Sequence, residues 1–149
     1  MQEAELASVV GTPFPGGLYT IDPEQNATVV RLLGGPGPAD DEAHPAYGYI
    51  ATRVGCGFGV DDILALVEAT TADGPMVGSL DLDYRRPLRV GETYAVSGEV
   101  TSVVRKQGRK IGVFDLLAFE LRLVDGNGDL ALVCTQSWVL PRRDVDAAA

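Results

Sequence analysis

The chain of 149 residues has little of several features that would each assign it to a class of protein. It has only two cysteines, Cys56 and Cys134, which make no disulfide framework and lack the spacing of metal ligands. None of its apolar runs approaches the ~18 residues that a membrane span needs. Its first residues are acidic where a secretory signal would be basic. The sequence therefore predicts a cytoplasmic protein without a metal site or a membrane segment.

Positive charge is scarce too, since 12 basic residues stand against 21 acidic ones and the net charge is −9. Such a surface repels nucleic acid and anionic membranes, so we expect neither as a partner. Seven of the twelve basic residues nevertheless lie between Arg85 and Lys110. They indicate either two solvated hairpin ends or one basic rim that suits phosphate groups or an acidic partner protein.

The composition, 46% hydrophobic and 22% charged, is that of a folded globule, and the length is that of one domain. We expect residues 1–149 to form this domain. Residues 1–17 carry no helix signal and read as an irregular lead-in. The charged and alanine-rich end, 142–149, reads as a frayed tail.

The first half of the chain predicts short strands over 18–21 and 27–33, then a short helix over 45–53 that opens at a proline. A glycine-rich turn, 55–59, separates it from the best helix candidate, 60–71. That helix is apolar nearly all round, which favours burial. Its main stripe follows the i, i+3, i+4, i+7 pattern and consists of Val60, Ile63, Leu64 and Val67.

From Met76 onward the apolar period changes to two, which is typical of strands. The first strand runs into the proline and glycine turn at 85–92, and a second strand follows it. Two further strands, 111–123 and 130–140, flank a strong turn signal at 125–129. The strand 111–123 begins with apolar residues on both faces. One helix cannot cover both faces of a sheet, so we expect a second copy of the chain to supply the other cover.

A helix followed by a long antiparallel sheet resembles the hot-dog fold, an α+β architecture in which the sheet wraps around a central helix. The residues His44-Pro45-Ala46-Tyr47 look like those of the hydratase and dehydratase branch of this superfamily, which includes MaoC-like proteins and non-catalytic subunits. The resemblance implies an acyl thioester as substrate, with coenzyme A or phosphopantetheine as part of it and no separate cofactor. It also implies a homodimer that joins two sheets edge to edge, and an acyl carrier protein as a candidate partner.

The sequence departs from the motifs of that superfamily around His44. In a Gly-Asp-x-Asn-Pro-x-His motif the catalytic Asp lies five residues before the His, where this chain has Ala39, and no Asn-Pro precedes His44. The His-Phe-Pro-Gly signature of the bacterial carrier-protein dehydratases is absent as well. A general layout remains, with a His ahead of the helix and an acid within it, for which Asp61, Asp62 and Glu68 are available.

We predict His44 and Asp62 as the catalytic residues. His44 is the only histidine of the chain and would move a proton near neutral pH. Asp62 of the partner subunit would assist, although Asp61 and Asp62 also suit the positive end of a helix dipole without any function. The glycine turn would offer N–H donors to a thioester carbonyl. The predicted substrate-binding residues are Tyr47, Gly57, Phe58, Gly59 and Arg86.

Three functions follow from these observations. The first is a hydratase or dehydratase that adds water to, or removes it from, an enoyl or 3-hydroxyacyl thioester. The second is a thioesterase on the same fold, although the His-Gly-Gly word of one thioesterase branch is missing. The third is a subunit that binds an acyl chain or completes a heterodimer without catalysis.

Overall fold

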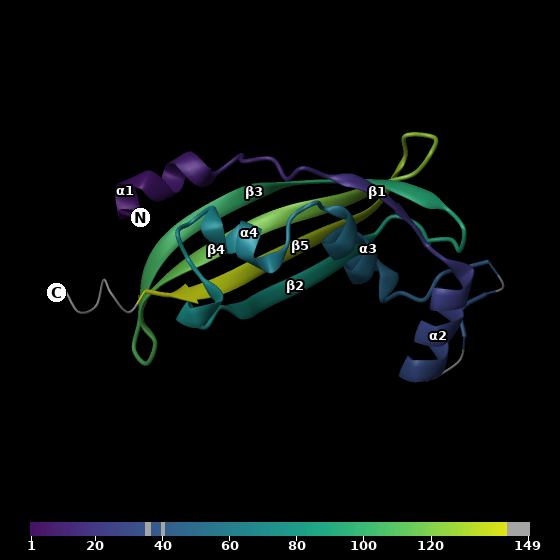
Figure 1. Cartoon of the computed structure of the whole chain (residues 1–149), viewed down its shortest axis with the longest axis horizontal. Helices are drawn as coiled ribbons and strands as arrows, with labels where there is room; N and C mark the ends of the chain where they lie inside the picture. Colours follow the sequence, from purple (N-terminus) through teal and green to yellow (C-terminus); the bar gives the residue numbers. More distant parts are fainter. Residues whose placement is uncertain (35–36, 40, 143–149) are drawn as a thin grey trace.

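The computed structural model describes residues 1–34, 37–39 and 41–142, and within them five strands form one antiparallel sheet in the order β1-β3-β4-β5-β2. Helices lie against its concave face, as Figure 1 shows. The sheet wrapped around helices confirms the predicted α+β architecture. The strands are β1 (Gly17–Thr20), β2 (Met76–Tyr84), β3 (Thr93–Gly108), β4 (Gly112–Val124) and β5 (Leu130–Pro141).

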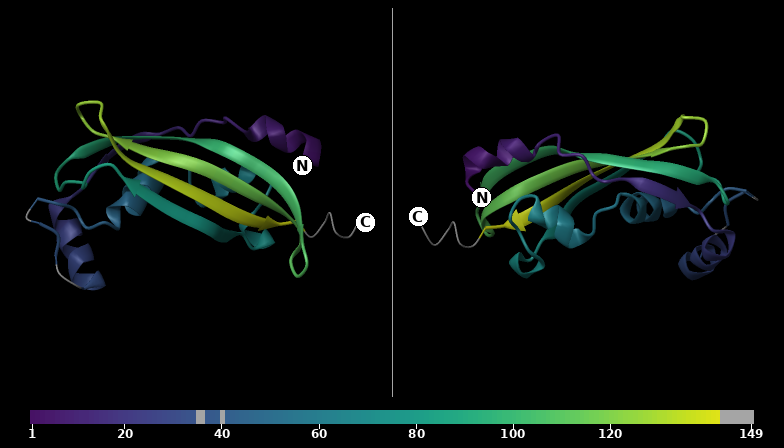
Figure 2. Two further views of the ribbon diagram at one scale, coloured as in Figure 1. Left: turned by 180° about the vertical axis from the view of Figure 1, so that it is seen from behind. Right: turned by 45° about the horizontal axis from the view of Figure 1, so that its top comes forward.

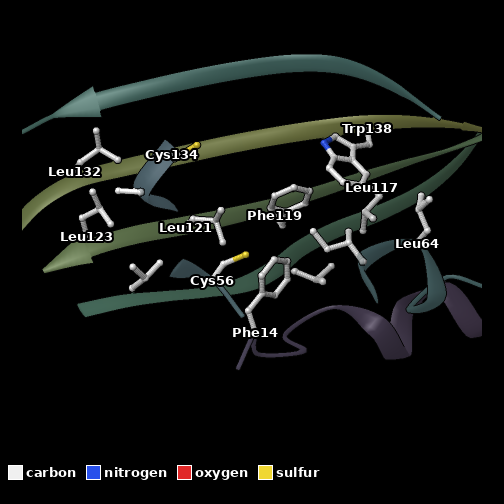
Figure 3. Close-up of a cluster of buried hydrophobic side chains, with 14 of the residues drawn as sticks. Phe14, Cys56, Leu64, Leu117, Phe119, Leu121, Leu123, Leu132, Cys134 and Trp138 are labelled. Atoms are coloured by element: carbon white, nitrogen blue, oxygen red, sulfur yellow. The ribbon is translucent and has the colours of Figure 1, made fainter. Parts of the chain in front are cut away.

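The concave face of the sheet carries the core. Along β4 the predicted inner residues Leu117, Phe119 and Leu121 have no exposed surface. Their neighbours on the adjacent strand β5 are, in the same order, Trp138, Gln136 and Cys134. Figure 3 shows this layer, with Phe14 and Cys56 facing it from the other side. Burying one Leu or Phe side chain contributes about 1.5–3 kcal/mol, so this layer is a main source of stability.

The helix at the centre of the fold is α3 (Tyr47–Gly55), which contacts all five strands. The predicted helix over 45–53 is therefore confirmed, but the sequence had given the central place to 60–71. Gly48 allows α3 to approach the sheet, since a Cβ there would lie 2.1 Å from Tyr84 Oη and 2.8 Å from a methyl group of Leu132. Thr52 Oγ1 donates to the Gly48 carbonyl at 2.8 Å inside the same helix.

The predicted helix over 60–71 is wrong in its length, because α4 spans only Val60–Ala65. The chain turns at Glu68, which has a positive φ of 52°. Arg142 donates to the carbonyl oxygens of Val67 and Glu68, and so satisfies groups that a longer helix would have used. A short 3-10 helix, η2 (Thr71–Asp73), then leads into β2.

The prediction of an irregular lead-in over 1–17 is wrong. This segment begins with α1 (Glu3–Leu6) and the 3-10 helix η1 (Ala7–Val9). The main-chain N–H of Gln2 donates to Glu5 Oε2 at 2.7 Å at the start of α1. Leu6 and Val9 are buried, and both elements contact β3. Packing on the sheet thus stabilises helical turns that are too short to form alone.

The strand predicted over 27–33 is also wrong, since these residues belong to α2 (Pro23–Leu33). Asp22 Oδ1 accepts the N–H of Gln25 at 2.8 Å, and Pro23 occupies the first helical position. These start signals outweigh the β propensity of the run Thr28-Val29-Val30. The helix stands apart from the centre of the sheet, at one end of the molecule (Figure 1).

Strand β2 forms one edge of the sheet, and the convex face carries none of the described helices (Figure 2). Cys56 and Cys134 are both buried and not bonded to each other. In the described part of the chain, no helix is long and apolar enough to cross a membrane, and no group of His, Cys, Asp and Glu side chains could hold a metal ion. From residue 143 on, the predicted frayed tail lies outside the described residues.

Candidate functional site

His44 lies on the loop before α3 and is held by main-chain contacts. Its own N–H donates to Asn26 Oδ1 of α2 at 2.8 Å, and its ring Nδ1 accepts the N–H of Ala46 at 3.0 Å. A ring nitrogen that accepts an N–H carries no proton, so the neutral ring has its proton on Nε2. In this orientation His44 offers one N–H donor, which suits a developing negative charge on an oxygen atom.

A cavity of about 390 Å³, here called the His44 cleft, opens beside this loop. Its lining includes Ala43 and Pro45, the two neighbours of His44, but not His44 itself, and on the other side the segment from Tyr84 to Leu88. The Tyr84 hydroxyl donates to the Pro45 carbonyl. Burial raises the pKa of Tyr84, so this hydroxyl stays protonated at neutral pH.

Arg86 lines the His44 cleft but is already paired. Its guanidinium lies 3.0 Å from Glu92 Oε1 and 2.5 Å from Asp125 Oδ2, and its Cζ lies over the Tyr94 ring, 5.8 Å from the ring centroid. Burial, followed by the hydrogen bond to Glu92, raises the pKa of Tyr94 to about 12. Arg86 therefore joins the β2–β3 connection to the β4–β5 turn, and its predicted substrate contact stays a prediction.

The basic residues between 85 and 110 do not form one rim. Arg85, Arg86 and Arg89 precede β3, whereas the others lie near its far end, from Arg105 on. The 12 residues of β3 before Arg105, at ~3.3 Å per residue, separate the two groups by about 40 Å along the strand. The structure thus favours two hairpin ends over one rim. Several of these arginines have carboxylate partners, namely Arg85–Asp83, Arg89–Asp41 and Arg105–Asp115.

Tyr47 lies in a second cavity, of about 580 Å³, between α2 and α3. Its ring lies 6.4 Å from that of Tyr19, and Asp22 also lines this cavity. Burial is the main cause that raises the pKa of both tyrosines. The cavity therefore presents neutral hydroxyls beside a carboxylate, an environment that disfavours a phosphate group.

The glycine turn is held against the segment before β1. Gly57 has a φ of 80°, and a Cβ there would lie 2.8 Å from Pro15 Cβ. The Phe58 ring packs 5.0 Å from Phe14. The Gly59 N–H donates to Asp62 Oδ2 at 2.8 Å, so this donor is engaged at the start of α4. The structure thus brings Asp62 to Gly59, and neither cavity lining includes them.

Three buried polar side chains were missed from the sequence: Asn26, Asp115 and Gln136. Asn26 holds the main chain of His44, and no pattern in the sequence points to it. Asp115 and Gln136 fall in phase with the apolar face of their strands. A polar residue at such a position needs a buried partner, and that was the available signal.

No protein-family model matches the chain, and no curated protein matches it in sequence. Solved structures do match. The ChsH1–ChsH2 complex from Mycobacterium tuberculosis has a TM-score of 0.72 at 20% identity, over 92% of this chain and 89% of that one. The HadBC (3R-hydroxyacyl-ACP dehydratase) complex from the same organism has a TM-score of 0.62 at 10% identity, over 87% and 96%. A MaoC-like dehydratase from Rhodospirillum rubrum has a TM-score of 0.59 at 15% identity, over 90% and 93%.

These neighbours share a fold with the chain rather than a close sequence. A further match is titled a hot-dog-like protein, from Thermanaerovibrio acidaminovorans. The predicted hot-dog fold is therefore confirmed.

Proposed function

We propose that this protein binds acyl thioesters and serves a hydratase or dehydratase reaction, with His44 as the residue that polarises the thioester carbonyl. The observation that carries this proposal is the orientation of the His44 ring on the loop before α3, beside a cleft of about 390 Å³. The hot-dog fold supports the substrate class, because the HadBC complex with this fold is described as a 3R-hydroxyacyl-ACP dehydratase.

The chemistry needs a base as well as this donor. In dehydration, a carboxylate takes the α-proton while the negative charge moves onto the thioester oxygen, where the Nε2–H of His44 stabilises it. The Cβ–O bond then breaks, the double bond forms, and the leaving hydroxide takes the proton back from the carboxylic acid as water. Asp62 of the partner subunit is the predicted carboxylate. Its Oδ1 is the oxygen left for this role, since Oδ2 accepts the Gly59 N–H.

A partner subunit fits the open edge of the sheet. Strand β2 pairs only with β5 in the described chain, and its residues Met76, Val77 and Leu80 are about half exposed or more. On the convex face, Phe114 and Leu116 are half-buried. A second hot-dog subunit along β2 would pair the free main-chain groups of this edge. We expect light scattering to give the mass of at least a dimer, as a homodimer or with a related subunit.

The test is a panel of crotonyl-, 3-hydroxyacyl- and saturated acyl-CoA thioesters, with enone absorbance and free thiol followed separately. A change in enone absorbance without thiol supports the hydratase or dehydratase. Thiol release would instead make the protein a thioesterase. Silence in both signals, with binding of acyl-CoA retained, would favour a non-catalytic subunit.

Three variants assign the residues. His44→Asn keeps an acceptor for the Ala46 N–H but loses the Nε2 donor, and we expect it to lower kcat/KM by about 100-fold or more. Asp62→Asn should lower turnover as well. Asp61→Asn makes the same change at the neighbouring exposed residue and serves as the control. Unchanged turnover in His44→Asn would remove His44 from the mechanism.

A second candidate, the binding subunit, has its own support. Within residues 1–34, 37–39 and 41–142, the hydrogen-bond partner of the His44 ring is the main-chain N–H of Ala46 rather than a carboxylate. The ChsH1–ChsH2 and HadBC structures are complexes of two named components. This candidate gains if acyl-CoA binds with equal affinity to wild type and to Asp62→Asn while neither turns it over.

A further inference from the structure

Arg53, near the end of α3, differs from most arginines of the chain. It has no carboxylate within salt-bridge distance in the part of the chain that the structure describes. Its side chain is nonetheless half-buried rather than free in solvent. The arginines that do have such a partner are Arg85, Arg86, Arg89, Arg105, Arg122 and Arg142.

The guanidinium of Arg53 lies over an indole ring. Its Cζ lies 5.7 Å from the centroid of Trp138, and Nη1 lies 3.5 Å from Cys56 Sγ, a weak acceptor. Most of its five N–H donors therefore have no protein acceptor among the described residues. No buried side-chain nitrogen or oxygen lacks a partner there, so these donors lie where solvent or a ligand reaches them.

Arg53 lines a small pocket of about 180 Å³, here called the Arg53 pocket. A cavity of this volume has room for several water molecules or for a small ligand. Arg53 supplies the only charge among the residues that line it, and the rest of the lining is mainly apolar. The lining consists of Tyr49, Arg53, Val60, Pro75, Met76, Val77 and Trp138.

We propose that the Arg53 pocket binds a carboxylate that ends a short apolar chain of about four carbons. The planar fork of a guanidinium matches the two oxygens of a carboxylate, and the guanidinium of Arg53 lies over the Trp138 ring. The chain of the ligand would pack on Val60, Met76 and Val77, so the pocket lies at the β2 edge, beside the subunit proposed to adjoin it. In an apolar pocket this single cation attracts an anion more strongly than in water, despite the net charge of −9.

Trp138 provides the measurement, because it is the only tryptophan of the chain and lines the pocket. Its fluorescence is titrated with pentanoate and with pentan-1-ol at constant ionic strength. The two probes have the same chain length and differ in the charged group. We expect a saturable change with pentanoate and at least about tenfold weaker binding of the alcohol. Equal affinities would overturn the proposal.

The variants separate this site from a general charge effect. Arg53→Gln should weaken pentanoate binding about tenfold or more, and Arg53→Lys should lie between it and wild type, since lysine keeps the charge without the fork. Arg31→Gln makes the same charge change at an exposed position of α2 and should bind like wild type. Wild-type affinity in Arg53→Gln would show that Arg53 only stabilises the end of its helix, and the proposal would be wrong.

Competition identifies the source of the carboxylate without any need for turnover. Adipyl-CoA carries a carboxylate on a four-carbon chain, and hexanoyl-CoA lacks it. Displacement of pentanoate by adipyl-CoA alone assigns the pocket to the end of an acyl group. Displacement by neither, with pentanoate bound, assigns it to a free acid. If pentanoate does not bind and Arg53→Gln lowers the mass in light scattering, Arg53 pairs with a carboxylate of another subunit, and the pocket proposal fails.

Discussion

Two arginine environments of this protein differ in what surrounds the cation. At one end of the sheet, the fully buried Asp115 accepts hydrogen bonds from Arg105 Nε at 2.8 Å and from Arg142 Nε at 2.7 Å. On the concave side, Arg53 lies over Trp138 without a carboxylate in the described chain. The first environment is closed, with one carboxylate shared by two guanidinium groups. The second is open and keeps unused donors.

The comparison indicates what each environment is for. Arg105 and Asp115 face each other across β3 and β4, and Arg142 continues to the carbonyl groups after α4. This cluster therefore holds distant segments together. A buried carboxylate is costly unless it is paired, so every member depends on the others. Arg53 has no carboxylate partner among the described residues, so the fold does not depend on an ion pair of this side chain. Its guanidinium is therefore available to a ligand.

The largest expected effect comes from opening the closed cluster. Asp115→Asn leaves the side chains of Arg105 and Arg142 without their shared anion, and we expect the free energy of unfolding to fall by about 3–5 kcal/mol. Urea denaturation at pH 7 measures this loss. Glu120→Gln, on the same strand, breaks a more exposed pair with Arg122 and should cost less than about 1 kcal/mol. Equal losses in both variants would contradict the structural role of Asp115.

Acid should open the same cluster in the wild type. Burial alone would raise the pKa of Asp115, but the hydrogen bonds and charges of Arg105 and Arg142 outweigh it and hold the pKa below its usual value. The stabilisation is therefore present above the unfolded pKa of ~3.9 and is lost as the pH falls through the folded value. We expect urea midpoints to decrease below about pH 4, and to decrease less steeply in Asp115→Asn. Parallel pH profiles would refute this assignment.

The Arg86 cluster is intermediate, because it is paired but only partly buried. Arg86→Gln would leave Glu92 and Asp125 without their shared cation, and we expect a loss of about 1–2 kcal/mol in unfolding free energy. Arg85→Gln breaks an exposed pair with Asp83 and should change stability by less than about 0.5 kcal/mol. Thermal and urea unfolding of the two variants give the comparison. If Arg86→Gln is as stable as Arg85→Gln, the Arg86 cluster is not structural.

The smallest effect is expected at Arg53. Arg53→Gln breaks no ion pair within the described residues, so its free energy of unfolding should stay within about 0.5 kcal/mol of wild type. Arg105→Gln, in the closed cluster, should lose at least about 3 kcal/mol in the same measurement. A large loss in Arg53→Gln would remove the difference between the two environments.

Local patterns in the sequence predicted much of the fold. The period of two from Met76 onward, and the turn signals at 85–92 and 125–129, predicted the strands close to their observed bounds. They succeed because alternation along a strand directly records which face is buried. The strand predicted over 27–33 is wrong, because the local start signal Asp22-Pro23 for a helix outweighs the β propensity of the residues that follow it.

The candidate site was only partly accessible from the sequence. His44 could be chosen because it is the only histidine, and its place before α3 is as predicted. The hydrogen bond from the Ala46 N–H to His44 Nδ1 and the one from the His44 N–H to Asn26 could not be predicted, because they depend on how the loop folds back on α2. Two catalytic residues were predicted, but the described chain shows no hydrogen bond between His44 and Asp62, and a partner subunit is needed to test that pair.

The sequence by itself determined the class of fold, because hydrophobic periodicity decides which residues are buried and turn residues decide where strands end. Only the tertiary structure decided where α4 stops, which arginines are paired, and that Arg53 meets Trp138. These outcomes join segments far apart in the chain, as when Arg142 donates to the carbonyl of Val67. Strand register and sheet curvature decide which distant side chains come into contact, and no local pattern of residues encodes these contacts.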